Sequence, residues 1–251
     1  MPMAETSKQY KALTYVKGCL EFFYKEEDDI LVAGDMFVYY EKGNPKKCLA
    51  PDVFVSFDVK NASEDRDTYK TWVEGTGLDV VFEILSETTW RKDVYEKAEI
   101  YNRLGVSEYF IFDPTGKLIQ PALQGFFLDH GKPMPLNWYP NYPRSIQSLR
   151  LDLFVCMTDT GLRLFDPGEG EYMRTEQEER EDRLIEKARA DSERDRADSE
   201  REDKLIEKAR ADSERERADS ERVDKLREKA RADALSARLK ELEARLAQRD
   251  V

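Results

Sequence analysis

Apolar residues near the start of the chain recur every three or four positions, and shorter apolar runs follow. On this spacing, residues 7–25 are predicted to form an amphipathic helix. Its apolar face holds Leu13, Val16, Leu20 and Phe23. The runs DILVAG, DMFVYYE and DVFVSFDV come next, and each predicts a short strand. Residues 58–77 are polar, and we expect a loop or an irregular excursion there.

A strand, a helix and a second strand are predicted in the middle of the chain. The run LDVVFEILS is apolar on both faces, as an interior strand should be. Thr88 or Thr89 can cap a helix over residues 90–104, which Gly105 ends. The buried stripe of this helix is expected to hold Val94, Ala98 and Tyr101.

The run SEYFIFDP predicts the next strand, with Asp113 as the turn residue that closes it. A strand, a helix and a strand within about 35 residues imply a right-handed crossover between parallel strands. Residues 117–167 hold further short extended runs, which we expect to form hairpins flanking this core. The fold class is therefore expected to be mixed α/β.

From about Thr175 the chain becomes highly charged and repetitive. Leu184, Leu205 and Leu226 are spaced 21 residues apart, which is three heptads. One heptad series is mostly alanine and its partner series mostly glutamate, so the coiled-coil seam is poor until the last heptads. We expect one long charged helix that pairs weakly, with a partly disordered tail as the alternative. The predicted domains are residues 1–173 and residues 174–251.

Histidine and cysteine content excludes several kinds of site. His130 is the only histidine, which excludes clustered-histidine zinc sites and makes a Ser-His-Asp triad improbable. The three cysteines form no C-x-x-C pair and suit a reducing compartment. The start MPMAETSKQYK has no apolar signal segment, and no run approaches the roughly 18–20 apolar residues of a membrane span. We expect a cytoplasmic protein without a membrane anchor.

Two acids occupy unusual positions in the predicted strands. Asp52 directly precedes VFVSF, and Glu83 lies inside VVFEILS, although burying an unpaired charge is costly. If the two strands are neighbours, both carboxylates converge at one sheet edge, where a cation between them would relieve their repulsion. Mg²⁺ suits such a pair, and the backbone carbonyl of Ile84 could complete the protein ligands. Lys97, in the following helix, could assist an attacking water.

The order of these residues resembles a known group of nucleases. P-D, then an acid in a strand, then a lysine resembles the PD-(D/E)xK nuclease superfamily. The strings APDVFVSF, DVVFEILSETT, KDVYEKAEIYNRLGVSEYFIFDP and LQGFFL are more specific. They resemble the Uma-type family of putative restriction endonucleases over about residues 10–170.

The resemblance implies a restriction-endonuclease-like αβββαβ core and metal binding by Asp52 and Glu83. The superfamily lysine is expected two residues after the acid, where this chain has Leu85. The resemblance places the lysine role in the following helix, at Lys97. Asp93 also matches the family string, either as an i, i+4 partner of Lys97 or near the water shell of the metal.

Two functions follow as expectations. The first is a Mg²⁺-dependent endonuclease acting on DNA, in which Mn²⁺ can substitute. The second is a nuclease fold that has become an adaptor for nucleic acid or protein. The net charge of −12, of which −9 lies in residues 1–173, is unlike the basic footprint of a tight duplex binder. We therefore expect weak, salt-sensitive binding, or targeting through a partner or through a homodimer formed by the helical tail or the nuclease domain.

Overall fold

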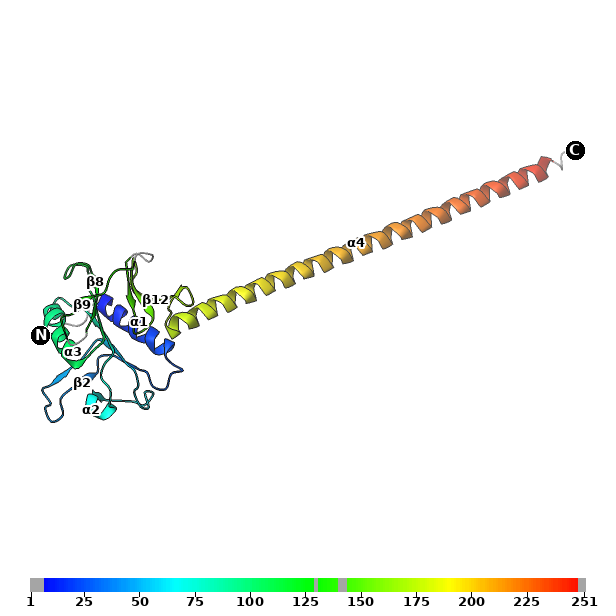
Figure 1. Cartoon of the computed structure of the whole chain (residues 1–251). Coiled ribbons are helices and arrows are strands. Elements are labelled where there is room, and N and C mark those ends of the chain that lie inside the picture. Colours follow the sequence, from blue (N-terminus) through cyan, green and yellow to red (C-terminus); the bar gives the residue numbers. More distant parts are fainter. Residues whose placement is uncertain (1–6, 129–130, 140–143, 248–251) are drawn as a thin grey trace. The chain divides into compact units, whose positions relative to one another are not determined.

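The computed structural model describes residues 7–128, 131–139 and 144–247, and His130 lies outside these ranges. The chain divides into two units, Met1–Glu181 and Asp182–Val251. The first unit holds the sheets and the second is helical (Figure 1). No helix in the described ranges is long and apolar enough to cross a membrane.

The first unit is built on a six-stranded sheet in the order β1-β4-β6-β7-β8-β9. Its strands are β1 (Leu31–Ala33), β4 (Val53–Ser56), β6 (Val80–Ile84), β7 (Glu108–Phe112), β8 (Leu123–Phe127) and β9 (Met134–Pro135). Only β6 and β7 pair in parallel, and the other neighbours are antiparallel. Helix α1 (Ser7–Phe23) precedes β1, and a helix joins β6 to β7. The expected αβββαβ order and the parallel crossover are therefore confirmed.

Two smaller sheets accompany this core. One has the order β10-β11-β12-β13, with β10 (Ser145–Ser148), β11 (Leu153–Thr158), β12 (Gly161–Asp166) and β13 (Glu171–Tyr172). The other has the order β3-β2-β5, with β2 (Phe37–Tyr39), β3 (Cys48–Leu49) and β5 (Thr68–Lys70). The excursion predicted at residues 58–77 therefore contains β5 and the short helix α2 (Thr71–Glu74), so the prediction of an irregular segment was wrong there. The three residues of β5 pair with β2 from far away in sequence, a contact that local composition does not encode.

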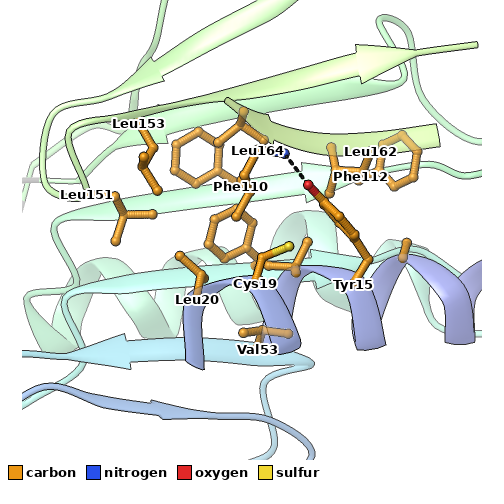
Figure 2. Packing of buried hydrophobic residues seen from close by; sticks show 14 of the residues in the cluster. Tyr15, Cys19, Leu20, Val53, Phe110, Phe112, Leu151, Leu153, Leu162 and Leu164 are labelled. Carbon is orange, nitrogen blue, oxygen red and sulfur yellow. Dashed lines mark hydrogen bonds between the residues drawn. The ribbon is translucent and has the colours of Figure 1, made fainter. Parts of the chain in front are cut away.

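The main sheet buries an apolar cluster on each face. On one face, α1 and the β10–β13 sheet pack against Val53, Phe110 and Phe112, as Figure 2 shows. The hydroxyl of Tyr15 accepts a hydrogen bond from the backbone N–H of Leu164 at 3.1 Å, which joins α1 to β12. The opposite face packs against the crossover helix and the three-stranded sheet. Because β6 is buried on both faces, it is apolar at every position except Glu83.

The crossover helix runs from Trp90 to Leu104, as expected, but its first turns are not regular α-helix. Residues Lys92–Lys97 form a π-helical segment, η1, which continues into α3 (Ala98–Leu104). Thr89 directly precedes the first helical residue, and its backbone N–H donates to Ser86 Oγ at 3.1 Å. Thr89 is therefore at one of the two predicted capping positions, and its Oγ1 donates to the Asp93 carboxylate at 2.9 Å. Gly105 ends the helix in the left-handed conformation, with φ of 77°.

The tail forms one helix, α4 (Glu176–Ala247), whose 72 residues span about 108 Å at 1.5 Å per residue. This confirms the predicted long charged helix. Thr175 and Glu178 cap its start reciprocally: Thr175 Oγ1 accepts from the Glu178 N–H at 3.2 Å, and Glu178 Oε2 accepts from the Thr175 N–H at 2.9 Å. The leucines that repeat every 21 residues are exposed on this helix.

Candidate functional site

The pairing of β4 with β6 brings the two unusual acids together. Val53 lies opposite Phe82 in the antiparallel register, so Asp52, one residue earlier, comes opposite Glu83. Residues opposite each other in such a pair project from the same face of the sheet. Asp52 Oδ2 accepts a hydrogen bond of 2.6 Å from the backbone N–H of Ile84. The half-buried Asp52 is therefore oriented along the end of β6, beside Glu83.

Glu83 is a carboxylate enclosed by the fold, with only 1% of its surface exposed. It projects from the face of β6 that the crossover helix covers. Two side chains of that helix reach it: Lys97 Nζ donates to Oε2 at 2.8 Å, and the Tyr101 hydroxyl donates to Oε1 at 2.6 Å. Burial raises the pKa of Glu83 above its usual value; the Lys97 ammonium opposes this rise, and the nearby Asp52 adds to it.

Lys97 supplies the positive charge in contact with Glu83, and its ammonium has three acceptors. Besides Glu83, it contacts Asp93 Oδ1 at 3.0 Å and donates to the backbone carbonyl of Ala50 at 3.3 Å. These three partners match the three donors of an ammonium. Burial lowers the pKa of Lys97, but Glu83 and Asp93 more than offset this effect, so the pKa is raised overall. Lys97 is therefore held as the protonated ammonium.

Asp93, Lys97 and Tyr101 follow each other at intervals of four residues along the crossover helix. Side chains at this spacing lie on one helical face, here the face turned toward β6. Asp93 is itself fixed, because Thr89 Oγ1 donates to its Oδ2 at 2.9 Å and the Tyr109 hydroxyl donates to its backbone carbonyl at 2.8 Å. The π-helical segment contains both Asp93 and Lys97, and such segments occur frequently at functional sites.

Three features of the site were missed by reasoning from sequence. Tyr101 was expected only in the buried stripe of its helix; the rings of Tyr101 and Tyr109 are buried, but their hydroxyls donate to Glu83 and to the backbone carbonyl of Asp93. Gly34 lies against the backbone carbonyl of Asp52, so closely that an added Cβ would overlap it. The sequence signal for Tyr101 was its place in the pattern D-x-x-x-K-x-x-x-Y, which begins at Asp93. Gly34 had no such signal.

The position where the superfamily pattern expects a lysine is part of the core. Leu85 is buried in the cluster beneath the crossover helix, and its backbone N–H donates to the Phe112 carbonyl at 2.8 Å. An ammonium there would replace apolar contacts. Lys97 reaches Glu83 from the helix instead, fourteen residues further along the chain.

Asp52, Glu83 and Lys97 line one cleft with a volume of about 700 Å³. Its other walls include the segment from Cys48 to Ala50, the hydroxyls of Ser86, Thr88 and Thr89, and the side chains of Phe37 and Lys92. Acids, hydroxyls and ammonium groups thus line one cleft, in which Glu83 is enclosed and Asp52 is half-buried. Such a set can bind a cation and a phosphate group.

The donor set is compatible with a hard divalent cation. Each oxygen of an ionised carboxylate has two lone pairs, so Glu83 can accept its two hydrogen bonds and still coordinate a cation. The N–H and C=O of one strand residue point to the same side; because the Ile84 N–H points to Asp52, the Ile84 carbonyl does too. Within the described residues, no group of three or more His, Cys, Asp or Glu side chains forms a metal site, so the available set is two carboxylates and a carbonyl.

The part of the chain that contains this site is similar to known proteins. The family model Uma2, described as putative restriction endonuclease, matches residues 4–131. Among solved structures, the chain is similar to a putative nuclease belonging to DUF820 from Anabaena variabilis, with 12% sequence identity and a TM-score of 0.39. That match covers 56% of this chain and 75% of the other. No curated protein matches the chain.

Proposed function

Because the chain belongs to the Uma2 family of putative restriction endonucleases, we propose that it is a Mg²⁺-dependent endonuclease that hydrolyses phosphodiester bonds of DNA. One observation supports this above all: Asp52 lies opposite Glu83 at the wall of an open cleft, and Lys97 donates to Glu83. We take residues 1–173 as the nuclease domain. We also propose that the chain forms a homodimer, through this domain or through α4.

Asp52, Glu83 and the carbonyl of Ile84 would hold the metal ion, Mg²⁺ or Mn²⁺. When bound, the ion supplies polarisation of a phosphoryl oxygen and a water of lowered pKa. The protein residues prepare the site for it. The backbone N–H of Ile84 orients Asp52, and the Tyr101 hydroxyl orients Glu83. Lys97 offsets part of the negative charge that two adjacent carboxylates accumulate.

We assign Lys97 a second role, in assisting the attacking water. All three of its donors are engaged, so the ammonium must release one acceptor to contact a water or a phosphate. The longest of the three contacts is the 3.3 Å hydrogen bond to the neutral carbonyl of Ala50, which is the easiest to exchange. Asp93 would keep the ammonium in place during this exchange, so we assign it a positioning role.

A catalytically inactive adaptor is the second candidate. The position that carries the superfamily lysine is the buried Leu85, and Lys97 is saturated with acceptors. If Lys97 never releases Ala50, the cleft binds nucleic acid or a protein without cutting. In that case the acidic chain would serve as a scaffold, with α4 as its spacer.

A nicking assay separates the two functions. The full chain is incubated with supercoiled plasmid and Mg²⁺ or Mn²⁺, and we expect nicking that EDTA abolishes. Asp52→Asn and Glu83→Gln should each reduce the rate at least 100-fold. Calorimetric titration with Mn²⁺ measures metal binding independently, and both variants should bind more weakly than the wild type.

Glu108→Gln is the matched control, because Glu108 is also a buried carboxylate but lies on β7 and is bound by Ser148 and the backbone of Leu149. We expect this variant to nick at nearly the wild-type rate when circular dichroism shows it to be folded. Metal binding without nicking would favour the adaptor. Equal nicking by wild type and Glu83→Gln would indicate a contaminating nuclease.

A further inference from the structure

We propose that the outward face of the β3-β2-β5 sheet binds unpaired nucleic-acid bases by stacking, and leads the strand to Asp52 and Glu83. This inference rests on the proposed nuclease function and narrows its substrate to a strand that is single or opened at the cleft. The face, called here the aromatic face, consists of Phe37, Tyr39, Cys48, Ala50, Thr68 and Lys70.

The register of the small sheet defines this face. Phe37 and Tyr39 are two residues apart on β2, so they project from the same side, and their ring centroids are 6.4 Å apart. Across β5, Phe37 pairs with Thr68 and Tyr39 pairs with Lys70. Across β3, Tyr39 pairs with Cys48. Val38, between the two aromatic residues, points to the other side and is fully buried.

Phe37 is unusual because a large apolar ring is exposed on a well-anchored strand. Of its surface, 55% is accessible, whereas β2 is the central strand of its sheet and is hydrogen-bonded on both edges. Burying this ring against the protein would have been favourable, by about 25 cal/mol per Å² of apolar surface. A rigid backbone that holds an exposed aromatic ring suits a stacking platform, because little order must be gained on binding.

The aromatic face leads directly into the catalytic cleft. Phe37, Cys48 and Ala50 are lining residues of the cavity that contains Asp52 and Glu83. The carbonyl of Ala50 is also an acceptor of Lys97. A strand that stacks on Phe37 would therefore lie at the cleft that contains the two carboxylates.

Local charge also favours a nucleic-acid strand over an acidic or neutral partner. The hairpin that joins β2 to β3 carries the exposed residues Lys42, Lys46 and Lys47 and a single acid, Glu41. Lys70, on the aromatic face itself, is exposed too. In a unit that is acidic as a whole, this places a local excess of lysines beside two aromatic rings. Phosphates can contact such lysines while the bases stack on the rings.

Fluorescence anisotropy of the full chain with a labelled oligothymidylate tests this inference. The measurement is made in EDTA, so that no cleavage occurs. Phe37→Ala should weaken binding by about 5- to 160-fold, the range expected for the loss of one stacked base. Phe37→Trp should bind at least as well as wild type, and its fluorescence should be quenched as the oligonucleotide binds. The melting temperature should fall only slightly, because more than half of the Phe37 surface is exposed.

Tyr172→Ala is the matched control: it also removes an aromatic ring that is about half exposed on a strand, but one outside the cleft. This control should bind as the wild type does. Equal affinities of wild type and Phe37→Ala would overturn the inference, as would equal loss of affinity in Phe37→Ala and Tyr172→Ala. A duplex of the same length that binds as tightly as the single strand would also overturn it.

The plasmid assay distinguishes this failure from failure of the proposed function. If the wild type nicks DNA but Phe37→Ala binds oligothymidylate normally, the aromatic face does not bind bases, and the nuclease function is still supported. If Phe37→Ala loses binding but neither the wild type nor any variant nicks DNA, base stacking on the aromatic face is supported and the nuclease function is wrong.

Discussion

Lys97 donates a 2.8 Å hydrogen bond to Glu83, and both charges are largely removed from water. Breaking a buried ion pair at one partner is more costly than removing both, because the remaining charge keeps its desolvation penalty. The stability of the fold and the charge balance of the site therefore depend on the same pair.

Replacing Lys97 with Met should lower the free energy of unfolding by about 3 kcal/mol, because Glu83 would lose the cationic side chain that donates to it. Adding Glu83→Gln to this variant should recover part of the loss, since Glu83 would no longer be a buried charge without Lys97, whereas Asp93 would still have lost its contact with the ammonium. Urea unfolding of the two single variants and the double variant gives the coupling energy. Additive losses would show that the two side chains do not depend on each other.

Tyr101→Phe should separate the support of Glu83 from ring packing. The change keeps the buried ring but removes the donor at 2.6 Å, at a cost of about 1–2 kcal/mol in stability. Tyr109→Phe is the control, because it removes an equally buried hydroxyl that bonds to the Asp93 carbonyl. Both should melt at lower temperature, but only Tyr101→Phe should also weaken Mn²⁺ binding in calorimetry. Equal loss of Mn²⁺ affinity in both variants would contradict a specific role for Tyr101.

The sequence predicts the charged residues of this site but not all of their partners. Glu83 was predictable because an acid inside an apolar strand needs a partner, and the strand spacing then suggested Asp52. Lys97 became a candidate through the family string. The hydroxyl contact of Tyr101 was not predictable, because an aromatic residue at helical spacing has the same pattern whether or not its polar tip is used.

The strands of the fold also differ in how well the sequence predicts them. Strands β6 and β7 were predictable because their apolar runs are long enough to be recognised alone. Strands β3 and β5 have two and three residues, and they exist through pairing with β2 rather than through their own composition. The π-helical segment η1 has no sequence signature of this kind, yet it contains both Asp93 and Lys97.

Gly34→Ala should damage the site without touching any charged residue. A Cβ at Gly34 would overlap the carbonyl oxygen of Asp52, which belongs to the backbone and cannot move alone. We expect Asp52 to shift away from Ile84, so that Mn²⁺ affinity falls at least tenfold. Gly43→Ala is a useful comparison, because nothing lies near an added Cβ there, although its positive φ adds local strain. Unchanged Mn²⁺ affinity in Gly34→Ala would argue against this contact controlling the site.

Asp113 should make the stability of the protein sensitive to acid. Its carboxylate accepts hydrogen bonds from the Thr115 hydroxyl and the backbone N–H groups of Thr115, Leu118 and Ile119. Burial opposes ionisation, but these bonds outweigh it, so the pKa of Asp113 is lowered. A lowered pKa gives stability above the unfolded value of about 3.9 that is lost as the pH falls through the folded value.

Asp113→Asn therefore should cost about 1–3 kcal/mol at pH 7, and this difference from wild type should shrink at pH 3 and below. Urea unfolding at both pH values measures it. A difference that stays constant with pH would mean that the cost arises from the shape of the turn rather than from the carboxylate charge.

The stability of the first turn of α4 should depend on Glu178 more than on Glu176, another acid of the same turn. Glu178 accepts from the Thr175 N–H and also bonds to Arg163 Nη1 at 2.9 Å, and these contacts lower its pKa despite partial burial. Glu178→Ala should fray the first turn, seen as faster hydrogen exchange over residues 178–181. Glu176→Ala also removes an acid from the first turn, so it loses the same favourable interaction with the helix dipole but neither of these bonds. Equal exchange in the two variants would show that the dipole, rather than the cap and Arg163, secures the helix start.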